Sequence, residues 1–325
     1  MNTNCTKDNG RLAFIDIAKG ILIILVVMGH IAPGDTVLHH YIFWFHMPAF
    51  LLISGFFIKS TFVFKEEMEK KLKRLMIPYL FFSLSLGTMA RNGAFLQQVL
   101  GTIWGGNANT TYCTFPYYFI TVLFCSYGLY YVLNNSLIST KKKWMIAALL
   151  YAMMYIVSKV IPDSLLGWIP WHIDKGFYVL IYLMLGKEIA KKKLYLHQKW
   201  IGGGILVIAV CVLLERNGIY RYDYDLKHHN WTFGLDIVIP MACLVVLLLI
   251  SRLIAKIPFV NGFLGYIGNG SMVVLLLHPL FIWKLNPLLG NGNILVLTVI
   301  NILCCMLAYS ALRSNPYTRI IIGEN

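Results

Sequence analysis

The chain has 325 residues, of which 58% are hydrophobic and only 13% are charged, and its mean hydropathy is +0.68. Soluble domains carry about 25% charged residues, so this composition excludes an ordinary soluble protein and favours a membrane protein. The net charge of +14 predicts no nucleic-acid partner, because the basic residues gather in the loops between apolar segments.

Ten apolar segments are long enough to cross a bilayer, for which a helix needs about 17–25 residues. They lie at 12–31, 39–59, 75–91, 116–134, 144–160, 174–190, 200–216, 233–251, 268–285 and 293–312. Glycine or charged residues interrupt two of them, 75–91 and 174–190. The sequence predicts an all-α, polytopic bundle of about ten transmembrane helices. We expect one integral-membrane domain over 1–325 and no soluble domain.

The basic residues are distributed unevenly on the two sides of these segments. With the N-terminus in the cytoplasm, 21 of the 28 Lys and Arg residues fall on the cytoplasmic side and 7 on the exterior side. This asymmetry follows the positive-inside rule and predicts that both termini lie in the cytoplasm. The longest exterior loops, 92–115 and 217–230, are too short to build cores of their own.

The first segment carries Asp16, Lys19 and His30 on one helical face. At 100° and 1.5 Å per residue, Lys19 and His30 lie about 20° apart around the axis and about 16 Å apart along it. Ionisable residues are costly within a bilayer and are therefore candidates for function. Two interpretations stay open. The stripe lines a passage, or Asp16 and Lys19 pair at the interface while His30 bonds a neighbouring carbonyl.

The second segment contains His46 and Ser54 within otherwise apolar sequence. Pro48 is expected to kink this helix, and Gly55 is expected to allow close approach of a neighbouring helix. In the basic turn that follows, Lys71 and Arg74 are three residues apart and project together from one helix face. Such a turn suits a phosphate, although anchoring to anionic lipid explains the same charges.

The later segments add Ser271 and His278, seven residues apart and about 20° apart on a helix. Pro279 is expected to break the helix directly after the histidine. Asp174 and Asp236 lie near segment ends, where boundary charges are common. No HxxxH pair stands on a segment, so we predict no metal site.

Together these residues resemble the integral-membrane acyltransferase type 3 family. The family opening is a basic residue, ten further residues and a histidine, here Lys19 and His30, preceded by a frequent Asp at Asp16. The stretch FHMPAFLLISGFF at 45–57 is similar to the fucose 4-O-acetylase-like branch. The further matches are the turn with Lys71 and Arg74 and the late Ser271 and His278.

The resemblance implies a function and three groups of site residues. It implies transfer of an acetyl or other acyl group from cytoplasmic acyl-CoA to a hydroxyl of a cell-surface glycan or its lipid-linked precursor. The catalytic residues would be His30, as general base or acyl-accepting nucleophile, and Asp16. The donor would contact Lys19, Lys71 and Arg74. The acceptor side would be lined by His46, Ser54, Ser271 and His278.

Two departures from the family pattern bear on this expectation. Lys19 stands where the family usually has Arg, which replaces a two-pronged phosphate contact by a point charge. The extracytoplasmic esterase-like domain of many members is absent from this sequence. We expect a multi-pass protein of the bacterial inner membrane, in contact with lipid, and leave open a homo-oligomer or a glycan-assembly partner. The alternatives are a transporter or flippase that uses the histidines as a proton relay, and a sensory or uptake module.

Overall fold

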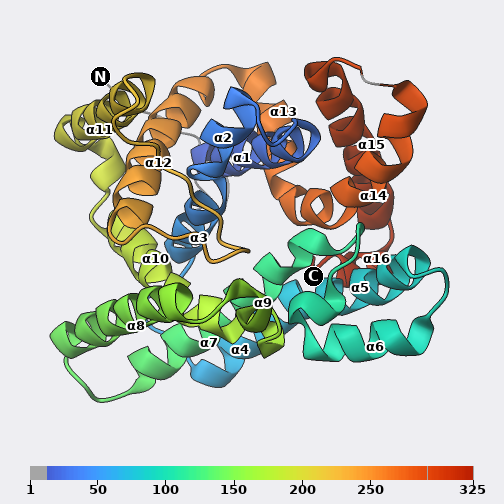
Figure 1. Cartoon of the computed structure of the whole chain (residues 1–325), viewed down its shortest axis with the longest axis horizontal. Coiled ribbons are helices and arrows are strands. Elements are labelled where there is room, and N and C mark those ends of the chain that lie inside the picture. Colours follow the sequence, from blue (N-terminus) through green and yellow to red (C-terminus); the bar gives the residue numbers. More distant parts are fainter. Residues whose placement is uncertain (1–12, 291, 325) are drawn as a thin grey trace.

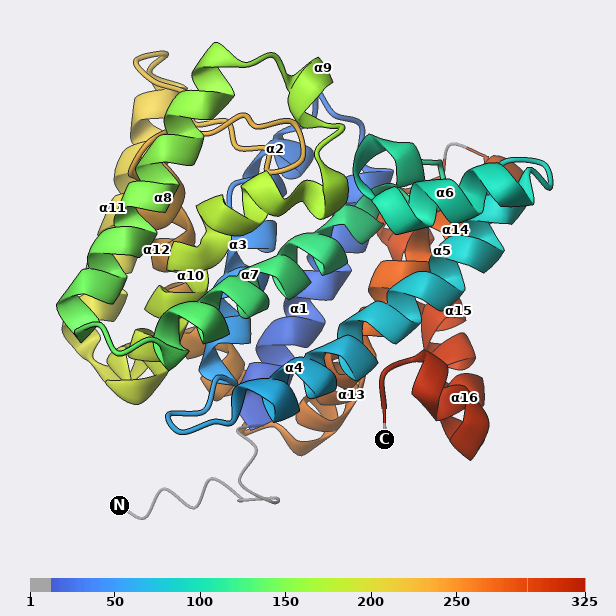
Figure 2. The same ribbon diagram turned by 90° about the horizontal axis from the view of Figure 1, so that it is seen from below.

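The computed structural model describes residues 13–290 and 292–324. In this part of the chain every regular element is a helix, and the only strand-like pairing is an isolated bridge between Asp225 and Asn230. Figures 1 and 2 show the helices gathered into one bundle. The all-α prediction is confirmed.

Eight described segments are long and apolar enough to cross a membrane. They are α1 (Ala13–Ile31), α2–α3 (Val37–Phe56), η3–α7 (Phe115–Asn135), α8 (Thr140–Val160), α11 (Gln198–Arg216), α12 (Leu235–Ile254), α14 (Ser271–Leu289) and α15 (Ile294–Ser314). The two interrupted segments form α5 (Ile77–Ala90) and α10 (Ile173–Lys191), which are too short or too charged to join these eight. The chain is therefore a multi-pass membrane protein, and the count of ten stays a prediction.

Short helices connect the long ones. They are α4 (Phe64–Lys71), the π-helix η1 (Leu72–Met76), α6 (Phe95–Trp104), η2 (Gly106–Asn109), α9 (Asp163–Leu166), η4 (Pro170–His172), η5 (Leu194–Leu196), α13 (Pro258–Asn269) and α16 (Pro316–Ile321). The loop 92–115 thus contains a helix, α6. The loop 217–230 is mostly irregular, yet it buries Tyr222, Tyr224 and Leu226 against the bundle.

The helices divide into an inner and an outer set. Most residues of α1, α7 and α10 are buried or half-buried, and α1 lies near the centre of the bundle in Figure 2. On α11, by contrast, Gly204 is the only buried residue. Apolar side chains that are exposed on a membrane-spanning helix face lipid, so α11 lies at the bundle surface.

Two prolines act differently from each other. The second span is divided at Trp44 and Phe45 into α2 (Val37–Phe43) and α3 (His46–Phe56), four residues before Pro48, where a proline ring meets the carbonyl of the preceding turn. Pro279, in contrast, lies inside an uninterrupted α14. The expected break after His278 is wrong, because packing of this buried helix outweighs the single missing hydrogen bond.

Glycines set two close helix crossings. A Cβ atom on Gly55 would lie 2.3 Å from the Leu183 carbonyl oxygen, and one on Gly186 would lie 1.9 Å from the Leu52 carbonyl oxygen. Helices α3 and α10 therefore touch backbone to backbone, as expected for Gly55. A second crossing of this kind joins α1 to α13 through Gly20 and Gly268.

Replacing Gly186 with Ala should lower the free energy of unfolding by about 1–3 kcal/mol, because the new methyl group meets backbone that cannot rotate away. Thermal unfolding in detergent measures the change. Gly202 on α11 is the matched control, since a Cβ atom there meets nothing within 4 Å, and Gly202→Ala should be neutral or slightly stabilising. Equal unfolding temperatures for the two variants would contradict the backbone contact at Gly186.

Candidate active site

A cavity of about 450 Å³ lies between α1, α3, α7 and α14. Its walls include five of the residues singled out in the sequence, namely Lys19, Ser54, Lys71, Arg74 and Ser271. They come from segments up to about 250 residues apart, which only the folded bundle brings together. The volume falls within the range of about 300–1,000 Å³ that is usual for small-molecule sites.

The cavity follows one stripe on each of its helices. On α1 it is lined by Lys19, Ile23 and Val26, and the next residue on that helical face is His30. On α14 the same spacing leads from Ser271 through Leu275 to His278. The basic residues therefore mark one end of the site, here called the basic end, and the histidines mark the opposite, histidine end.

Three predicted histidines meet at the histidine end. The rings of His30 and His278 stack with their centroids 5.3 Å apart and their planes at 16°. Phe43 joins this pair to His46, with centroid distances of 5.8 Å to His30 and 4.6 Å to His46. The residues come from α1, α3 and α14, so the histidines predicted from three separate spans form one cluster.

Hydrogen bonds orient two of these rings. Nδ1 of His278 donates to the Val274 carbonyl and Nδ1 of His46 donates to the Ile42 carbonyl, each at 2.9 Å. Each Nε2 consequently keeps a lone pair for accepting a proton. The Nε2 atom of His278 is buried and has no hydrogen-bond partner within the described residues. The His30 ring has ring contacts but no hydrogen bond there, so the carbonyl bond considered for it is not seen.

At the basic end, Lys71 closes α4 and Arg74 lies in the π-helix that follows. Such wide turns are frequent at functional sites. The Lys71 ammonium lies 3.8 Å from the centre of the Tyr127 ring. Burial lowers the pKa of Lys71 to about 8, and a bound anion would restore its full positive charge. Arg74 remains exposed to solvent.

Asp16 lies at the basic end, away from His30. Its carboxylate is buried and contacts the Lys19 ammonium at 3.1 Å, whereas fourteen residues of the uninterrupted α1, about 21 Å, separate it from His30. The structure thus pairs Asp16 with the donor side of the expected site. At this distance Asp16 cannot contact the histidine cluster.

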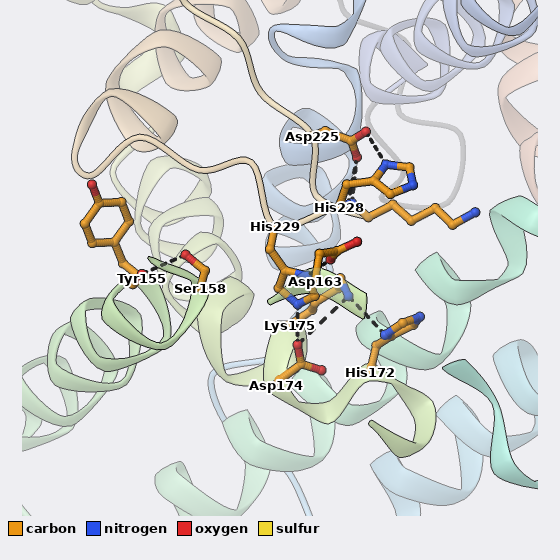
Figure 3. Close-up of polar contacts among 10 residues, drawn as sticks. Tyr155, Ser158, Asp163, His172, Asp174, Lys175, Asp225, His228 and His229 are labelled. Atoms are coloured by element: carbon orange, nitrogen blue, oxygen red, sulfur yellow. Dashed lines mark hydrogen bonds and ion pairs between the residues drawn. The ribbon is translucent and has the colours of Figure 1, made fainter. Parts of the chain in front are cut away.

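The sequence analysis missed a buried ionic network around the amino-terminal end of α10. Figure 3 shows His229 between two carboxylates, and its Nε2 lies 2.6 Å from Asp174 while its Nδ1 contacts Asp163. The ring can donate to both only as an imidazolium. Lys175, fully buried, donates to Nδ1 of His172 at 3.0 Å. Asp174 is thus no boundary charge, and neither is the buried Asp236, which accepts from Tyr178.

The loop 217–230 carries part of this network to the histidine end. The Lys227 ammonium lies 5.9 Å from the centre of the Phe115 ring, which packs edge-on against His30 at 4.9 Å. Beside it, a 2.7 Å bond between His228 and Asp225 raises the pKa of His228. The His228–His229 doublet between acidic residues was the signal that could have drawn attention to this loop.

No group of three or more His, Cys, Asp or Glu side chains in residues 13–290 and 292–324 is placed to hold a metal ion.

Comparison with known proteins gives one family and two curated relatives. The family described as an acyltransferase domain matches residues 12–312. The chain is 27% identical over 182 residues to the nodulation protein NolL of Sinorhizobium fredii, covering 47% of this chain and 45% of that protein. It is 26% identical over 231 residues to NolL of Mesorhizobium japonicum, covering 67% and 59%. The chain thus spans about half the length of these relatives. No solved structure matches it.

Proposed function

The chain belongs to the integral-membrane acyltransferase type 3 family, and from this we propose that it transfers an acetyl group from acetyl-CoA to a hydroxyl of a cell-surface glycan or its lipid-linked precursor. We place it in the bacterial inner membrane, with the basic end facing the cytoplasm. The observation that carries the proposal is a cavity with basic residues at one end and the histidine cluster beyond the other.

The donor would lie along this cavity. Lys19, Lys71 and Arg74 supply positive charge for its phosphates, and the apolar walls between Ile23 and Val26 suit an uncharged arm. The rise of about 16 Å from Lys19 to His30 is of the order of an extended pantetheine arm. A donor held at the basic end thus presents its thioester at the histidine end.

The reaction then moves one proton in two steps, from the acceptor to His30 and from His30 to the leaving group. His30 takes the proton from the acceptor hydroxyl while the hydroxyl oxygen attacks the thioester carbonyl. The tetrahedral intermediate collapses, the carbon–sulfur bond breaks, and the proton passes to the departing thiolate. The products are an acetyl ester and free CoA. His46 and His278, whose Nδ1 atoms are already engaged, would accept hydrogen bonds from the acceptor. Ser54 and Ser271, expected on the acceptor side, line the cavity nearer the basic end, about 10–12 Å along their helices from these histidines, so they would contact the donor instead.

Purified protein in detergent tests the proposal directly. We expect it to bind acetyl-CoA and to release CoA thiol faster when fucose-containing or related glycans are added. Proteoliposomes distinguish the transporter alternative, because they would then show solute flux without thioester cleavage. Flux of that kind, with no CoA release under any acceptor, would overturn the enzyme proposal.

Replacing Lys71 and Arg74 together with Ala should weaken acetyl-CoA binding by about 30-fold, or about 2 kcal/mol, since two charge-assisted contacts are lost at a partly solvated site. Isothermal titration in detergent measures the affinity. The control is Lys73→Ala, which removes an exposed cation of the same turn that pairs with Glu69 and does not line the cavity. An unchanged affinity in the double variant would reduce this turn to an orientation signal.

A further inference from the structure

The basic end of the cavity also contains a carboxylate, contributed by the segment 322–324. Ile322, Gly323 and Glu324 line the cavity together with the cations, and Arg313 of α15 lines it as a further cation. Glu324 supplies the only carboxylate among the described residues of this wall. Its Oε1 accepts from the Tyr309 hydroxyl at 2.5 Å, and its Oε2 lies 3.2 Å from Nε of Arg313.

Backbone contacts hold this carboxylate in place. Gly323 has a positive φ of 74°, and a Cβ atom there would lie 2.5 Å from the Arg74 carbonyl oxygen. The Glu324 amide donates to the Arg319 carbonyl at 3.0 Å, and Ile322 is buried. Only glycine fits at position 323 without strain, so the segment packs closely against the turn that carries Arg74.

A carboxylate held by a guanidinium and a hydroxyl occupies a place that a phosphate also suits. Both are anions whose oxygens accept charge-assisted bonds, and Arg is well matched to either. Lys19, Lys71, Arg74 and Arg313 give the cavity wall four cations against this one acid, and the buried Asp16 beside Lys19 offsets one of them. The remaining positive charge favours a phosphate over the Glu324 carboxylate at this position, because the phosphate carries more negative charge.

We propose that Arg313 is a further donor-binding residue, and that Glu324 occupies its anion position until a phosphate group of the donor displaces it. This inference rests on the proposed function, because it takes the donor to be a phosphate-bearing thioester. It assigns Arg313 and Tyr309 to the donor phosphates and makes Glu324 an internal competitor. Residues 322–324 then move away from the Arg74 carbonyl when the donor binds.

Two variants release the carboxylate by different means. Glu324→Gln removes its charge, and Gly323→Ala keeps the charge but forces the segment off the Arg74 carbonyl. Each should raise the affinity for acetyl-CoA by about 2–5-fold, the scale of a partly exposed ion pair. Neither should change the affinity for S-acetylpantetheine, which has no phosphate. Arg313→Gln should lower acetyl-CoA affinity by about tenfold, and in that background Glu324→Gln should add little.

Binding is measured by titration in detergent, with Lys73→Gln as the charge-matched control and thermal unfolding as the check on folding. If Arg313→Gln unfolds, Arg313→Lys takes its place and should lose affinity less. Thermal stabilisation by pyrophosphate tests the anion site without any acyl group. Unchanged acetyl-CoA and pyrophosphate affinities in the Glu324, Gly323 and Arg313 variants would overturn the inference.

The two proposals fail differently. Loss of acetyl-CoA binding on changing Lys71 and Arg74, with no effect of Arg313 or Glu324, would keep the proposed function and remove the exchange. If wild-type protein binds pyrophosphate through Arg313 but does not bind acetyl-CoA, the displacement of Glu324 by a phosphate is supported. Acetyl-CoA is then not the donor.

Discussion

Replacing His30 with Gln should lower the rate of acyl transfer by about 10²–10⁴-fold, the usual contribution of a general base. Gln is similar in size and can form hydrogen bonds, but its amide has no useful basicity. Affinity for acetyl-CoA should stay near that of the wild type, because the phosphates are held about 16 Å away. Transfer of radiolabelled acetyl groups and donor affinity, measured on the same preparation, report the two effects separately.

The control for this variant is His197→Gln, which changes an exposed loop histidine far along the sequence from the cavity helices. It should leave both rate and affinity unchanged. A His30→Gln protein with near-normal transfer would end the catalytic role of His30. A loss of donor affinity equal to the loss of rate would instead place His30 in binding.

Replacing Asp174 with Ala should lower the free energy of unfolding by about 3–5 kcal/mol, the cost of leaving buried charges unpaired. Its carboxylate lies 2.6 Å from Nε2 of His229 and 3.9 Å from the fully buried Lys175 ammonium. Removal therefore leaves the buried Lys175 ammonium and the His229 ring without the carboxylate that lies beside both of them. Thermal unfolding in detergent measures the change.

Two further variants test this reading of the network. The double variant Asp174→Asn with Lys175→Met should recover much of the stability, because acid and ammonium then disappear together. Glu69→Ala breaks the exposed pair with Lys73 and should leave the unfolding temperature almost unchanged, because solvent screens such a pair. An Asp174→Ala protein that unfolds at the wild-type temperature would contradict a stabilising network.

The parts of the structure that depend on local periodicity were predictable. Helix α1 is uninterrupted from Ala13 to Ile31, so the angular and axial relation of Lys19 to His30 follows from helix geometry alone. Hydropathy likewise locates the eight segments that can span a membrane. The π-helix that begins at Leu72 was not predicted. The relative direction of Lys71 and Arg74 was worked out for a regular α-helix, and a π-helix has a wider turn.

Contacts between distant segments were not predictable from one sequence. Asp174 pairs with His229, 55 residues away. In the sequence, its position near the end of an apolar segment looks the same as that of an ordinary boundary charge. Helix α10 buries Asp174 and Lys175 at its amino-terminal end, and these charges lower its hydropathy below that of an ordinary span. Residues 322–324 reach the cavity only because α15 and α16 turn them back toward Arg74.

The break between α2 and α3 has an electrostatic consequence. Because α3 begins at His46, the amino-terminal end of a helix lies inside the bundle beside the stacked pair of His30 and His278. Aligned peptide dipoles place about half a positive charge at such an end, and the carboxyl end of α2 beside it carries the opposite charge along its own axis. Under the proposed reaction, a thioester carbonyl oxygen on the axis of α3 would be stabilised by the positive end as it becomes an oxyanion, without any movement of the protein. A continuous helix from Val37 would carry the same charge about 14 Å further along its axis.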